Sequence, residues 1–94
     1  MEAVKTEVLD KLKEGLTPGE LLEELNRRMN RSVSRSALFR WRQQLRFFTP
    51  PFYEDHIESL MVYGNLVGLG MKPQAAHEAT KEEIKLRKHA KGEI

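Results

Sequence analysis

The 94-residue chain has no cysteine, which excludes disulfide bridges and thiolate metal sites. It also lacks any apolar run that approaches the length of roughly 20 residues needed to span a bilayer, and charged residues are distributed throughout its first fifteen positions. We therefore expect a cytoplasmic protein with no signal peptide and no membrane contact. With 39% hydrophobic and 32% charged residues, the composition is typical of one small folded domain.

Side chains that could carry out catalysis or bind a metal do not gather in the sequence. The three histidines are scattered, without the spacing that would place two of them on one helix face. No glycine-rich phosphate loop follows a strand pattern, and no nucleophile, acid and base converge. We expect no enzyme activity, no metal and no cofactor.

Positive charge is concentrated in one segment. The formal net charge is only +2, yet residues 27–46 contain seven arginines and no acidic residue. Arginine binds phosphate oxygens bidentately and keeps its charge at any relevant pH, so this segment predicts contact with a polyanion. The seven residues are Arg27, Arg28, Arg31, Arg35, Arg40, Arg42 and Arg46.

Hydrophobic periodicity predicts a mainly α fold with about five helices. Thr17, Pro18 and Glu20 have the pattern of an N-cap, a first-turn proline and a capping box. Ser34 is the expected N-cap of the next helix, and Gly64 is expected to weaken the fourth. The predicted helices cover residues 2–14, 18–29, 34–46, 55–69 and 73–88.

The segment 46–53 has aromatic residues on both sides of a proline pair, which predicts a short β-ribbon or an extended loop. Its aromatic side chains could stack on unpaired bases, but we expect them to pin the segment onto the helices because so small a core has few other large residues. They are Phe47, Phe48, Phe52 and Tyr53.

Two helices joined by a short turn, with arginines on the second, form a helix-turn-helix pattern. We expect helix 18–29 to support the second helix, and helix 34–46 to enter the major groove of double-stranded DNA. Leu38, Trp41 and Leu45 form its predicted buried stripe. Base edges would be reached by Arg35, Ser36 and Phe39, phosphates by Arg27, Arg28, Arg31, Arg42 and Arg46, and Ser34 and Arg40 complete the candidate DNA site.

From Thr17 to Ala79 the chain resembles the winged helix-turn-helix domain of MerR-like regulators. The resemblance is carried by TPGELLEELNRR, SVSRSALFRWRQQL, FFTPPFY and DHIESLMVYGNLVGLGMKPQAAHEA. It implies an abbreviated wing at FFTPPFY and a DNA-binding domain over residues 17–88, between an accessory helix at 1–16 and a frayed tail at 89–94. Phe39 and Arg40 depart from the family's Arg-aromatic pair, and the family's dimerising helix and effector domain are missing, so no small-molecule effector is expected.

The resemblance implies a small transcriptional regulator. One recognition helix buries only the area of a single DNA-binding module, which gives limited specificity. We therefore expect a homodimer or a cooperative array on DNA. The apolar side of helix 2–14 would either cover the core of its own chain or pair with a second protomer. Stand-alone domains of this kind also act in excision and DNA packaging, which leaves a phage or plasmid accessory factor as an alternative. An adaptor that binds an acidic protein through the arginines is the alternative of another class.

Overall fold

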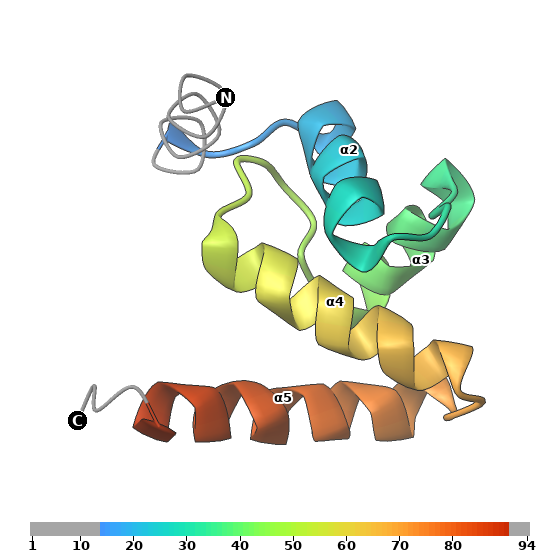
Figure 1. The fold of residues 1–94 in the computed structure, drawn as a ribbon, viewed down its shortest axis with the longest axis vertical. Helices are drawn as coiled ribbons and strands as arrows, with labels where there is room; N and C mark the ends of the chain where they lie inside the picture. Colours follow the sequence, from blue (N-terminus) through green and yellow to red (C-terminus); the bar gives the residue numbers. More distant parts are fainter. Residues whose placement is uncertain (1–13, 91–94) are drawn as a thin grey trace.

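The computed structural model describes residues 14–90 and is mainly helical, as predicted (Figure 1). Residues 2–13 of the predicted helix at 2–14 and residues 91–94 of the predicted tail lie outside this range, whereas His89 and Ala90 belong to the last helix. Within residues 14–90 the four helices are α2 (Pro18–Met29), α3 (Arg35–Leu45), α4 (Glu54–Gly68) and α5 (Pro73–Ala90).

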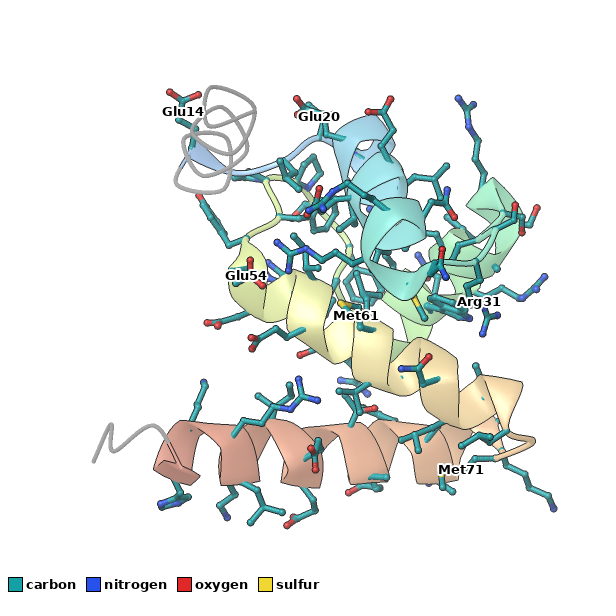
Figure 2. The ribbon with its side chains drawn as sticks, viewed as in Figure 1. Glu14, Glu20, Arg31, Glu54, Met61 and Met71 are labelled. Carbon is teal, nitrogen blue, oxygen red and sulfur yellow. The ribbon has the colours of Figure 1, made fainter. Side chains whose placement is uncertain are left out.

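Helix α4 lies at the centre of the arrangement. Figure 1 shows α5 running along one side of α4 and α2 on the other side, and α3 contacts both α4 and α5. Glu14 lies on the left in Figure 2, as does the last turn of α5 in Figure 1, while α3 lies on the right. The two ends of the described chain are therefore on the side away from α3.

Helices α2 and α3 begin at the predicted caps. The Thr17 hydroxyl accepts a hydrogen bond from the Glu20 N–H (3.2 Å), and the Glu20 carboxylate accepts one from the Thr17 N–H (3.0 Å), which completes the capping box. The Ser34 hydroxyl accepts from the Ala37 N–H (3.0 Å). Asn30 ends α2 in the left-handed conformation (φ 52°). A short turn therefore fixes where α3 begins relative to α2.

The buried side of α3 also agrees with the prediction. Leu38, Trp41 and Leu45 are all buried, and the Trp41 ring meets Tyr63 of α4 edge-on with ring centroids 6.3 Å apart. Gly64 faces the same indole, and a Cβ atom at this position would lie 2.6 Å from the ring. The expectation that Gly64 only weakens α4 was therefore incomplete, because the absence of a side chain lets Trp41 pack against the helix.

The predicted β-ribbon at 46–53 is wrong, and the alternative of an extended loop is confirmed: no strand forms within the described residues. Phe52 makes a single antiparallel bridge with Leu16, its N–H donating to the Leu16 carbonyl (2.9 Å) and its carbonyl accepting from the Leu16 N–H (2.7 Å). Pro50 and Pro51 have no N–H to donate, so the segment cannot pair with itself as a ladder.

Only half of the aromatic residues in this loop pin it to the helices. Phe52 is fully buried and Phe47 is partly buried, and both rings meet the His56 ring edge-on, with centroids 5.8 and 4.7 Å away. Phe48 and Tyr53 are instead 54% and 41% exposed. The expectation that all four anchor the loop therefore holds for Phe47 and Phe52, while Tyr53 keeps one ring contact, with His56 (centroids 6.0 Å apart), and Phe48 is the more exposed of the other two.

His56 makes the loop sensitive to pH. Its Nδ1 atom accepts a hydrogen bond from the Tyr53 N–H (2.9 Å), which requires the neutral ring. Burial lowers the pKa of His56 below its usual value, against an opposing effect of the nearby Asp55 carboxylate. Because the unfolded chain then binds the proton more readily, the stabilisation is complete above the unfolded pKa near 6.5 and is lost as the pH falls through the lower folded pKa.

We predict that the free energy of unfolding falls by about 1 kcal/mol between pH 7 and pH 5, the value of one hydrogen bond. His56→Gln should remove this pH dependence, because glutamine at the third helical position can still accept from the N-cap N–H but does not titrate. Urea unfolding at several pH values measures this pH dependence. His89→Gln, at an exposed residue of α5, is the control. An unchanged pH profile in His56→Gln would contradict the prediction.

Candidate nucleic-acid interface

The outer side of α3 is exposed, basic and free of carboxylates. Helix α3 contains no acidic residue, and its side chains opposite the buried stripe are exposed. Arg46 continues this surface as the C-cap, in the left-handed conformation (φ 63°). We call the following set the α3 face: Arg35, Ser36, Phe39, Arg40, Gln43 and Arg46.

The α3 face has the chemistry needed to read base edges. An α-helix with its side chains fits the major groove, which is about 12 Å wide. Arginine can bind guanine bidentately, and glutamine can bind adenine bidentately. Phe39 is 58% exposed and could contact a thymine methyl group. Gln43 was not among the predicted site residues, although its spacing of four from Phe39 places it on the same side of the helix.

Arg28 is already bonded to two carboxylates. Its Nη1 and Nη2 atoms donate to Glu54 (2.5 and 2.9 Å), and its Nε atom donates to Glu24 (2.5 Å). Glu54 lies at the start of α4 (Figure 2), so Arg28 joins α2 to α4. The Arg28 side chain is only 21% exposed, and the hydrogen bond to Glu54 helps to raise its pKa further. Its predicted phosphate contact would require these bonds to open.

Arg27 shares Glu24 but remains accessible. Burial alone would raise the pKa of Glu24, but hydrogen bonds from Arg27 and Arg28 outweigh it and keep the pKa below its usual value. The Arg27 Nε atom lies 3.1 Å from the Glu24 carboxylate. Its side chain is still 62% exposed, because only one edge of the guanidinium faces Glu24. Arg27 therefore keeps donors for a second anion.

Arg42 holds the loop that follows α3. Its Nε atom donates to the Phe47 carbonyl (3.0 Å), its Nη2 atom donates to the Phe48 carbonyl (2.8 Å), and its guanidinium lies 4.7 Å from the centre of the Phe52 ring. The residue is half-buried. Although Arg42 was predicted to contact phosphate, these bonds give it a structural part in fixing the loop beside α3.

The other arginines remain at the surface. Arg31 is exposed and lies 5.9 Å from the centre of the Trp41 ring, at the end of α4 distant from Glu54 (Figure 2). Ser34 is exposed, but its oxygen already caps α3, which leaves its hydroxyl hydrogen to donate. The structure thus separates the seven arginines into Arg28 and Arg42, which are tied into the fold, and an exposed group consisting of Arg27, Arg31, Arg35, Arg40 and Arg46.

A groove of about 300 Å³ extends the α3 face towards the start of α2. Arg35, Phe39 and Arg42 line it from α3, opposite Pro18 and Gly19. No carboxylate is among its lining residues. The groove therefore places two arginines of α3 opposite an uncharged wall formed by the start of α2.

Within the described residues 14–90, no group of three or more His, Asp or Glu side chains could hold a metal ion. No helix in that range has the length and hydropathy needed to cross a membrane. No protein-family model, curated protein or solved structure matches the chain.

Proposed function

We propose that the protein binds double-stranded DNA sequence-specifically, with α3 in the major groove, and that it acts as a small transcriptional regulator. The observation that carries this proposal is the two-sided construction of α3. One side is anchored in the core by Leu38, Trp41 and Leu45, and the other is an exposed, basic surface without carboxylates. This is the arrangement that a recognition helix needs.

The exposed arginines fit two kinds of contact. Arg35 lies in the first turn of α3, the part of a recognition helix that reaches base edges, and Ser36 and Phe39 follow it on the same face. Arg27, Arg31 and Arg46 lie at the ends of α2 and α3, where they would contact the phosphates on either side of the groove.

A MerR-like arrangement is part of the proposal. In it, α2 and α3 are the helix-turn-helix, loop 46–53 takes the place of the wing, and α4 and α5 are the helix pair that follows. Arg42 supports this arrangement because it bonds the loop to α3. We propose that the protein acts as a dimer or as several copies along one DNA, since a single recognition helix makes a module-sized interface.

Binding should depend strongly on salt. If each protomer neutralises roughly four phosphates, the logarithm of the association constant should fall with the logarithm of the salt concentration at a slope of about −3 to −4. Arg46→Ala should flatten the slope by about one unit, because it removes an exposed cation outside the first turns. Arg35→Ala should weaken binding about tenfold and relax the base preference. Fluorescence anisotropy on duplexes selected from a random pool measures the salt slope, the affinity and the base preference.

Arg87→Ala provides the matched control. Arg87 is the only arginine outside residues 27–46, and it lies on α5 beside Glu83, with a nitrogen–oxygen distance of 3.3 Å. This substitution removes the same charge but should leave both the slope and the preferred sequence unchanged. Failure of the random pool to yield any preferred duplex would contradict the proposal and favour the adaptor for an acidic protein.

A further inference from the structure

A second groove lies on the opposite side of α3 from the α3 face. It has a volume of about 320 Å³ and runs between the end of α3, α4 and α5. Leu45, Phe47 and Ile84 form its apolar part. Leu45 is on the buried stripe of α3, so the groove and the α3 face use different sides of that helix.

Three lysines of α5 line the same groove. Lys81, Lys85 and Lys88 are four and three residues apart, which places them on one side of the helix over about 10 Å. All three are exposed, and no acidic residue is among those that line the groove. Glu83 of α5 lies outside the lining and pairs with Arg87. The groove therefore combines an apolar floor with a rim of one charge.

We propose that this groove binds an acidic amphipathic helix of a partner protein. Its leucine-like side chains would enter the apolar part, and glutamates or aspartates with the same four- and three-residue spacing would pair with Lys81, Lys85 and Lys88. Grooves from about 300 Å³ upward can hold a few apolar side chains, and helix-in-groove binding places such anchors at helical spacing. Duplex DNA would meet the lysines but has nothing to fill the apolar part.

The partner would bind without covering the α3 face. A chain of this size that also binds DNA through α3 could in this way bring an acidic segment of another protein to the DNA. The groove proposal does not depend on DNA binding, because Lys81, Lys85 and Lys88 belong to α5 and none of them is part of the α3 face.

A synthetic, capped helical peptide of about 16 residues tests the proposal, with leucines along one side and glutamates flanking them at the lysine spacing. The matched probe has glutamines in place of the glutamates. We expect the full chain to bind the glutamate peptide at least about tenfold more tightly, because only this peptide is complementary to the lysines. In NMR titrations the shifted amide signals should be those of residues 77–88, Leu45 and Phe47.

Lys85→Glu should weaken binding of the glutamate peptide about tenfold, since one attraction becomes a repulsion. Lys72→Glu makes the same change of charge at an exposed residue outside the groove and should leave the affinity within about twofold. Equal binding of the two peptides, equal effects of the two variants, or no binding would each overturn the proposal. Displacement of the glutamate peptide by duplex DNA would assign the lysines to nucleic acid and overturn it as well.

Discussion

Replacing Phe52 with alanine is expected to lower the free energy of unfolding by about 4 kcal/mol, as is usual when a buried phenylalanine is truncated. The Phe52 side chain is fully buried. It supports the Arg42 guanidinium, 4.7 Å from the ring centre, and meets His56 edge-on. Removing the ring leaves a cavity where the loop, α3 and α4 meet, so the loss combines apolar burial with the support of Arg42.

Phe48→Ala is the control for this prediction. It removes the same ring from the same loop, but Phe48 is 54% exposed, so the change should stay within about 0.5 kcal/mol. Urea unfolding followed by the fluorescence of Trp41, the only tryptophan, compares the two variants. Similar losses in both would mean that the loop is held by its backbone contacts and that burial of Phe52 contributes little.

Gly64→Leu is expected to lower the free energy of unfolding by about 3 kcal/mol, at the upper end of the range for overpacked cores. Leucine is intrinsically better than glycine in a helix by about 1 kcal/mol, so propensity alone predicts the opposite sign. Packing decides the outcome, because a Cβ atom would already lie 2.6 Å from the Trp41 ring and 3.1 Å from the Met29 methyl group. Trp41 is only 6% exposed, so most of its surface is already in contact with neighbouring residues that would have to shift with it.

Gly19→Leu gives the matched control, since no atom lies within 4 Å of a Cβ atom at Gly19, in the first turn of α2. Because nothing opposes the gain in helix propensity at this position, Gly19→Leu should raise the free energy of unfolding by up to about 1 kcal/mol. A double-mutant cycle adds a second measurement: in a Trp41→Leu background, Gly64→Leu should cost at least about 1 kcal/mol less than in the natural sequence. Full additivity of the two substitutions would show that the indole does not determine the need for glycine.

The parts of the fold that were predicted from the sequence depend on residues close together in the chain. The capping box joins Thr17 to Glu20, and the Ser34 cap acts three residues ahead on Ala37. Helical periodicity likewise placed Trp41 in the core, because its spacing from neighbouring leucines is a local property. Short-range patterns of this kind define where helices begin and which side they bury.

The parts that were missed depend on contacts between distant residues. Arg28 and Glu54 are 26 residues apart, so no local pattern could show that this arginine would join α2 to α4. Phe52 pairs with Leu16, and Gly64 packs against Trp41 across two helices. The arginines of residues 27–46 look equivalent in the sequence, whereas the fold ties Arg28 and Arg42 into the structure and leaves the others exposed. Burial and partners, which decide this difference, arise only when the helices pack.

The described chain enters and leaves the molecule on the side away from α3. A fluorescent protein, an affinity tag or a covalent tether attached at either end of residues 14–90 would therefore start on the side of the molecule away from the α3 face. Two copies of residues 14–90 could be linked in tandem by a flexible spacer with both α3 faces still accessible, and the length of that spacer would then set the distance that the two faces can span together.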